Sequence, residues 1–151
     1  MDFKVRLGQK EDMQAVFNLI TELAVFEKEP DAVEITVTDL VRDGFSETPK
    51  FKVFVAEQEH NIIGIALFYE RYSTWKGKCL YLEDFYVKEN TRKEGVGSQL
   101  YNAVIEVAKS KKVRRMDWQV LDWNQPAIDF YVKHNAKLDN HWINGRLTFE
   151  Y

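Results

Sequence analysis

The sequence predicts an α/β (α+β) fold in which a central, mixed and mostly antiparallel twisted sheet is flanked by helices. Of the 151 residues, 45% are hydrophobic, which is enough apolar material for one core. Apolar spacing changes along the chain between the period of a strand and that of a helix, in the order β-α-α-β-β-β-α-β-α-β. Three successive strands joined by short turns favour antiparallel pairing at the centre of the sheet. Because no repeat or linker divides the chain, we expect one domain over residues 1–151.

The first half of the chain should contain a strand, two helices and a hairpin. Residues 3–7 alternate between apolar and charged side chains, which is typical of a strand, and apolar spacing then indicates a helix over 10–26. Thr38 is expected to cap a short helix that ends near Gly44. Two apolar, β-branched or aromatic segments separated by a short polar turn predict an antiparallel hairpin of residues 52–57 and 61–72.

The second half should alternate strands with helices. A helix is expected to open at Pro126 behind a capping Asn124, and Asn135 could close it in the left-handed conformation. The remaining apolar periods predict a strand over 80–88, a helix over 98–109, a strand over 115–121 and a last strand over 146–151.

Composition excludes several classes of protein. The net charge of −3 and a pI near 5.7 argue against a nucleic-acid binder, which usually carries a basic stripe. Cys79 is the single cysteine and excludes a cysteine-rich metal site, and the spacing of His60, His134 and His141 is not that of metal ligands, so we expect no metal. The sequence starts without a signal-peptide core, and no apolar run approaches the roughly 18 residues of a membrane span. We therefore expect a cytoplasmic protein that does not bind membranes.

The most informative stretch is a predicted strand followed by Arg-x-x-Gly-x-Gly and an amphipathic helix. Arg92, Gly95 and Gly97 lie where backbone N–H groups at the helix start can gather around a phosphate. No third glycine completes a dinucleotide fingerprint, and no Gly-Lys-Ser/Thr triplet makes a P-loop. Two glycines alone also fit an ordinary loop, so the placement between strand and helix carries the prediction of a phosphorylated cofactor.

The wider pattern resembles the GNAT superfamily of N-acetyltransferases, and within it the diamine (spermidine/spermine) and thialysine acetyltransferase branch. Three separated segments carry the likeness to the branch: 39–45, 80–85 and 123–131. The resemblance implies acetyl-CoA as co-substrate, with its pyrophosphate on Arg92-x-x-Gly95-x-Gly97. The residues it implies around this cofactor are Phe85, Tyr86, Val87, Arg92, Lys93, Glu94, Gly95, Val96, Gly97, Ser98, Asn124, Ala127 and Tyr131.

The same resemblance assigns catalytic roles that spacing alone does not. Tyr131 would be read as a packed aromatic, but the resemblance makes it the acid that protonates the departing thiolate. Glu83 and Asp84 are neighbours on a strand, so only one should face a given cleft. By resemblance Glu83 helps to deprotonate the amine, directly or through water, and Asp84 holds a cationic substrate if the strand bulges. Phe26 and Glu27 would line the acceptor site.

An alkyl ammonium needs such acids, because only about one molecule in two thousand is neutral at pH 7 and only the neutral amine attacks a thioester. We expect acetylation of a small cationic primary amine by direct attack in a ternary complex. Residues 142–146 lack the acidic pair of the polyamine enzymes, which leaves thialysine, lysine or another amino acid open beside diamines and polyamines. Protein or peptide N-acetylation and a non-catalytic acyl-CoA-binding module are the alternatives. The resemblance also implies a homodimer.

Overall fold

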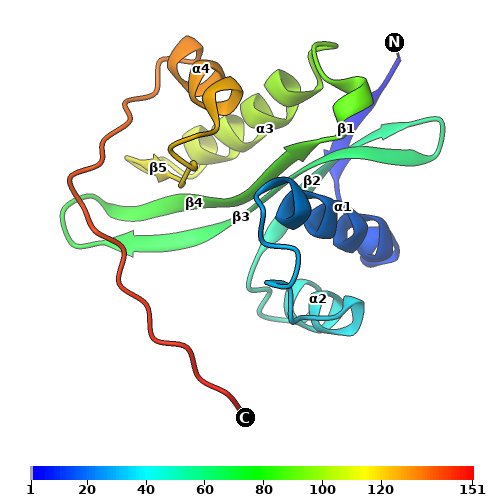
Figure 1. The fold of residues 1–151 in the computed structure, drawn as a ribbon, viewed down its shortest axis with the longest axis horizontal. Helices are drawn as coiled ribbons and strands as arrows, with labels where there is room; N and C mark the ends of the chain where they lie inside the picture. The colour runs from blue at the N-terminus through cyan, green and yellow to red at the C-terminus, as the bar shows by residue number, and fades with distance from the viewer. Residues whose placement is uncertain (1) are drawn as a thin grey trace. The chain divides into compact units, whose positions relative to one another are not determined.

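The computed structural model describes residues 2–151, and its sheet has five strands in the order β1-β2-β3-β4-β5 (Figure 1). The strands β1 to β4 pair in antiparallel fashion, whereas β5 is parallel to β4. This confirms the predicted mixed and mostly antiparallel sheet. Its strands are β1 (Lys4–Leu7), β2 (Lys52–Gln58), β3 (Asn61–Ser73), β4 (Gly77–Val87) and β5 (Met116–Asp117).

By internal contacts the chain divides into two compact units, one ending at Gln119 and the other comprising Val120–Tyr151. The first contains the whole sheet, and its helices are α1 (Met13–Phe26), α2 (Val37–Gly44) and α3 (Val96–Ser110), with short 3₁₀ turns η1 (Lys10–Asp12) and η2 (Glu89–Thr91). The second contains α4 (Gln125–Lys133).

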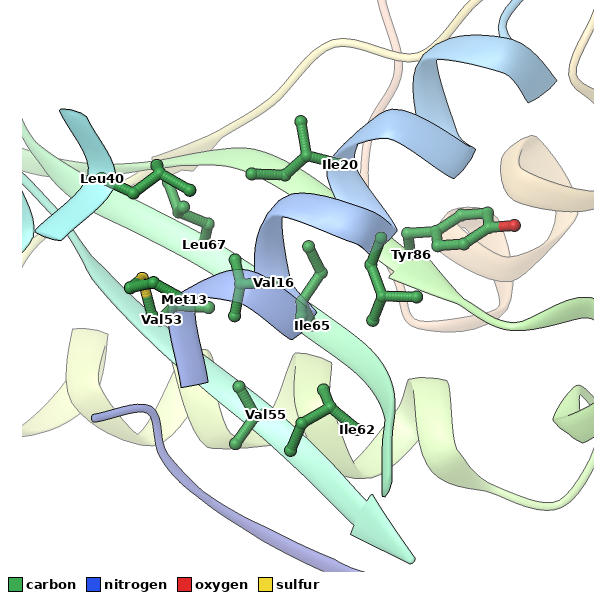
Figure 2. Packing of buried hydrophobic residues seen from close by; sticks show 11 residues of the cluster. Met13, Val16, Ile20, Leu40, Val53, Val55, Ile62, Ile65, Leu67 and Tyr86 are labelled. Carbon is green, nitrogen blue, oxygen red and sulfur yellow. The ribbon is translucent and has the colours of Figure 1, made fainter. Parts of the chain in front are cut away.

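Helices cover both faces of the sheet in the first unit. On one face lies the main core (Figure 2). Met13 and Val16 of α1 and Leu40 of α2 pack there against inward side chains of β2, β3 and β4, such as Ile65. On the other face α3 packs closely on β3, where a Cβ added to Gly64 would meet Leu100 Cδ1 at 2.9 Å. The sheet is therefore anchored on both sides, and the α1–α2 face is the one that carries the site described below.

The structure corrects three expectations about local structure. Thr36, not Thr38, caps α2: its hydroxyl accepts from the Asp39 N–H at 3.2 Å, and the Asp39 carboxylate accepts from the Thr36 N–H at 2.8 Å. This reciprocal capping box satisfies two N–H groups, which a lone cap at Thr38 could not do. The strand expected over 115–121 is reduced to β5, and residues 146–151 form no regular structure. Apolar alternation specifies the faces of a strand but does not supply the hydrogen-bonding neighbour that a strand requires.

In the described part of the chain, every helix is too short or too polar to cross a membrane.

Candidate active site

The strand β4 is paired along its length on one side only. It follows β3 from Gly77 to Val87, whereas β5 pairs with it at Leu80 and Tyr81 alone. Within the described residues, the edge of β4 that faces β5 therefore has no strand partner beyond Tyr81. Backbone groups from Phe85 to Val87, which were expected to contact a cofactor, lie in this one-sided part of the strand.

A β-bulge interrupts β4 at the two acids. Leu67 pairs with Asp84 and the next residue, Phe68, pairs with Leu82, so Glu83 is an extra residue with no partner on β3. A bulge resets the alternation of side chains along a strand. Glu83 and Asp84 consequently line the same pocket, although a regular strand would turn them to opposite faces.

The pocket lies on the α1–α2 face and has a volume of about 400 Å³. Its walls come from α1, α2 and the residue Ile35 before it, the loop before β2, and parts of β3 and β4. Four carboxylates and one amine give it its charge, and apolar side chains and one tyrosine complete the lining, which consists of Ile20, Ile35, Asp39, Leu40, Asp43, Lys50, Phe51, Leu67, Tyr69, Glu83 and Asp84.

The acids at the bulge act on one another electrostatically. Burial, followed by the negative charges of Glu83 and Glu27, raises the pKa of Asp84 from 3.8 to about 7. Burial also raises the pKa of Glu27, with a second contribution from Glu83. Three carboxylates at the end of α1 and on β4 therefore share a region in which a positive charge would be favoured. Glu27 itself is not among the residues that line the pocket.

Glu83 is held in place by a tyrosine on the neighbouring strand. The Tyr69 hydroxyl donates to Glu83 Oε1 at 2.8 Å, and the Tyr69 ring packs against Tyr81 with a centroid distance of 5.6 Å. Burial and the bond to Glu83 raise the pKa of Tyr69, so the phenol stays protonated and remains a donor. The bond from Tyr69 thus fixes the position of the Glu83 carboxylate, and Glu83 is exposed to solvent at the bulge.

Arg92 lies between two aromatic rings. Its guanidinium is 5.3 Å from the ring centroid of Phe26 and 5.4 Å from that of Tyr86, and its Nε donates to the Val87 carbonyl at 2.9 Å. Phe26, which was expected to line the acceptor site, is therefore a support for Arg92 and is not part of the pocket lining. One of the five N–H donors of the guanidinium is used by Val87, and the side chain remains exposed.

The loop after Arg92 contains two residues with a left-handed backbone and leads directly into α3. Lys93 has φ 70°, and Gly95 caps α3 with φ 86°, a left-handed conformation that favours glycine. The first bond of the helix runs from the Gln99 N–H to the Gly95 carbonyl at 3.1 Å. N–H groups of a first helical turn have no acceptor inside the helix and point along its axis. Residues 92–98 therefore include N–H groups at a helix N-terminus that could hold a phosphate.

The second unit contains the remaining expected site residues. Asn124 caps α4 by accepting from the Ala127 N–H at 3.4 Å, and Asn135 has φ 67° just beyond the helix, both as predicted. Tyr131 is buried, with its ring edge-on to Phe130 at 5.6 Å. In residues 2–151 no cluster of three or more His, Cys, Asp or Glu side chains could hold a metal ion.

Comparison with known proteins decides the family. Residues 13–136 match the acetyltransferase (GNAT) family. The chain belongs to this family. It is 42% identical over 141 residues to a thialysine N-epsilon-acetyltransferase of Bos taurus, covering 88% of this chain and 83% of that protein. The corresponding Mus musculus protein is 38% identical over 156 residues, covering 98% and 91%. A spermidine/spermine N(1)-acetyltransferase-like protein 1 of Homo sapiens is 35% identical, over 89% of this chain and 20% of that longer protein.

Solved structures of proteins less than 25% identical to this chain share its fold. An aminoglycoside acetyltransferase from a soil metagenome superposes with a TM-score of 0.81 at 19% identity, covering 98% of this chain and 97% of that one. An integron cassette protein from the mobile metagenome of V. cholerae gives a TM-score of 0.80 at 23% identity, with coverages of 99% and 94%. Family membership and the curated relatives together establish that this GNAT protein is an enzyme of acetyl transfer.

Sequence reasoning overlooked several residues of this acetyltransferase that line the pocket. Asp39 and Asp43 lie in a segment that contributed only to the family likeness, and neither Lys50 nor Tyr69 was given a role in the site. A signal for Tyr69 existed, because pairing of the two adjacent strands β3 and β4 brings Tyr69 opposite Tyr81 and close to Glu83. The other three come from a helix and a loop whose approach to β4 has no local signal.

Proposed function

We propose that this enzyme transfers the acetyl group of acetyl-CoA to a primary amine of a small cationic acceptor, by direct attack in a ternary complex. The observation that carries the proposal is the bulge in β4, through which Glu83 and Asp84 both face one pocket. The wall of this pocket that α2 forms bears Asp39 and Asp43. Carboxylates attract an ammonium group and can accept its proton. The thialysine N-epsilon-acetyltransferases among the relatives act on an acceptor of this class.

The loop before α3 and the first residues of that helix are the proposed site for the pyrophosphate of the co-substrate. Residues 92–98 would hold it, through backbone N–H groups around the left-handed Gly95 and through the exposed guanidinium of Arg92. A side chain at position 95 would find open space but a strained backbone. Backbone groups of Phe85 to Val87, with Asn124 and Ala127 of the second unit, are the proposed contacts to the rest of the cofactor. Acetyl-CoA supplies a thioester from which the acetyl group is transferred.

The acids of the bulge are proposed to prepare the amine. An alkyl ammonium has a pKa near 10.4 and must lose its proton before attack. Glu83, held by Tyr69, is the proposed base, directly or through water. The pKa of Asp84 is raised to about 7, so this carboxyl can gain or lose a proton near neutral pH. Binding of a cation beside Asp84 would favour its charged form.

Tyr131 is proposed as the acid. A phenol with an ordinary pKa near 10 can protonate a departing thiolate, whose thiol has a pKa near 8.5. This role requires the two units to act together, and we propose that they form one acetyltransferase domain. The family match across residues 13–136, which includes α4, supports this reading.

An amine panel tests the proposal. Thiol release from acetyl-CoA is measured with diamines, polyamines, thialysine, lysine and an N-terminal peptide, and we expect turnover with small cationic amines. Tyr131→Phe should lower kcat by one to two orders of magnitude with acetyl-CoA binding by calorimetry nearly unchanged, because the ring is retained and only the hydroxyl that donates the proton is lost. Binding of acetyl-CoA without turnover of any amine would instead identify a non-catalytic acyl-CoA-binding protein.

A homodimer and a cytoplasmic location complete the proposal. The last residues alternate apolar side chains that are exposed in the single chain, including Leu147, Phe149 and Tyr151. Their exposure is compatible with a second copy covering them. Light scattering coupled to gel filtration gives the mass, and a monomer at micromolar concentration would contradict the dimer.

A further inference from the structure

The charges that line the acceptor pocket are unequally distributed. On β4 there are only carboxylates, Glu83 and Asp84, and the negative charge of Glu27 acts on Asp84. The opposite wall, formed by α2 and the loop before β2, carries both signs: Asp39 and Asp43 are acidic and Lys50 is basic. A pocket for a plain diamine or polyamine would be expected to bear carboxylates at both ends and no basic side chain, so Lys50 is the residue that does not fit such an acceptor.

The carboxylates of the opposite wall already have a cationic partner. Arg42 Nη1 lies 3.0 Å from Asp39 Oδ1, and Arg42 Nε lies 3.0 Å from Asp43 Oδ1. Asp39 is fixed further by the capping box with Thr36. Lys50 is close in the fold, since its backbone N–H donates to the Asp43 carbonyl at 2.7 Å, but among residues 2–151 its ammonium has no ion-pair partner. The two negative charges of Asp39 and Asp43 are thus balanced by the positive charges of Arg42 and Lys50, and the ammonium of Lys50 is available to bind a ligand.

The sheet register gives the separation of the two walls. Asp84 on β4 pairs with Leu67 on β3, which pairs with Val53 on β2, and Lys50 precedes β2. Two strand spacings put the backbones of β4 and β2 about 10 Å apart, and Lys50 precedes Val53 by three residues, so Lys50 and the acids of the bulge lie in different parts of the pocket. A molecule that engages both must carry its amine and its other charges on a spacer of several carbons.

We propose that the wall with Lys50 is a subsite for the zwitterionic head of an α-amino acid acceptor, in which Lys50 binds the α-carboxylate and Asp39 and Asp43 face the α-ammonium. The side-chain amine of such an acceptor then extends across the sheet to Glu83 and Asp84. Lys50 is a specificity-determining residue in this arrangement and takes no part in the chemical step. The inference rests on the proposed function, because it names the acceptor class of the same pocket.

The test compares acceptors that differ only in the carboxylate. Thialysine is paired with bis(2-aminoethyl) sulfide, and L-lysine with cadaverine, because each pair has the same reacting amine and the same spacer. For the native enzyme we expect kcat/KM to favour the amino acid in both pairs. Lys50→Met should reduce this preference about tenfold through KM, since it removes one charge-assisted hydrogen bond. Lys50→Glu should reverse it, because a carboxylate there suits a second ammonium.

Lys52→Met is the matched control. It removes the same charge two residues away, but Lys52 pairs with Phe68 on β3 and does not line the pocket, so both kinetic constants should stay unchanged. Equal loss in Lys52→Met and Lys50→Met, or an unaltered preference in Lys50→Met, would overturn the subsite while leaving the acetyltransferase activity established. Absence of turnover with every amine would refute the proposed function itself, and the subsite with it.

Discussion

Replacing Asp84 by asparagine should stabilise the protein at neutral and alkaline pH while impairing its activity. The pKa of Asp84 is raised from 3.8 to about 7 by burial and by the charges of Glu83 and Glu27. A difference of about three pH units, at about 1.4 kcal/mol for each, means that ionising Asp84 costs the folded state up to about 4 kcal/mol. Because the side chain retains some contact with water, we expect Asp84→Asn to recover about 2–4 kcal/mol.

The pH dependence of this effect has a definite sign. A carboxyl with a raised pKa in the folded state favours folding fully below its unfolded value of 3.8, and that contribution is lost as the pH rises toward 7. The two proteins should therefore have similar unfolding free energies near pH 4. As the pH rises to about 7, the unfolding free energy of the variant should increasingly exceed that of the native protein, and above pH 7 the difference should persist. Urea denaturation at pH 4 to 9 measures this.

A control and an activity assay complete the Asp84 experiment. Asp31→Asn changes an exposed aspartate in the loop after α1 and should leave the unfolding curve unchanged at every pH. kcat/KM for the amine should fall at least tenfold in Asp84→Asn, because the neutral amide no longer attracts the ammonium. A variant that is equally or less stable than the native protein at pH 8 would refute the electrostatic strain inferred for the bulge.

Three further substitutions test the supports of the site. Tyr69→Phe removes the hydroxyl that donates to Glu83 at 2.8 Å, so kcat/KM should fall several-fold to tenfold. The unfolding free energy measured by urea denaturation should change by only about 1 kcal/mol. Unchanged kinetics would contradict a positioning role for Tyr69. Gly95→Ala places a side chain at φ 86°, which should cost roughly 1–2 kcal/mol in unfolding free energy and raise the Kd for acetyl-CoA measured by calorimetry; equal affinity would argue against this loop as the pyrophosphate site. Thr36→Ala removes the cap of α2 and should destabilise the protein by about 1 kcal/mol, with a higher KM for the amine because Asp39 loses its fixed position; Thr38→Ala is the control, and an equal effect there would contradict the observed cap.

Helices and strands were predictable because their signals are local. The apolar period of residues 10–26 and of the β2–β3 hairpin is set by which faces must be buried, and the structure confirms both. The Asn124 cap and the left-handed Asn135 are likewise properties of a few adjacent residues. The strand expected over 146–151 was wrong for the complementary reason, since pairing depends on a partner that the alternation of Leu147, Phe149 and Tyr151 does not specify.

For the site, the sequence alone determined the loop of residues 92–98, the presence of two adjacent acids on β4, and the family likeness that gives them a function. Only the tertiary structure decided that Glu83 and Asp84 face one pocket, because that depends on a bulge, and a bulge exists only in the register between two strands. The tertiary structure also brought Asp39, Asp43 and Lys50 opposite them. Local periodicity says which side of an element is buried, whereas the charges that meet across a pocket are set by the packing of segments far apart in the chain.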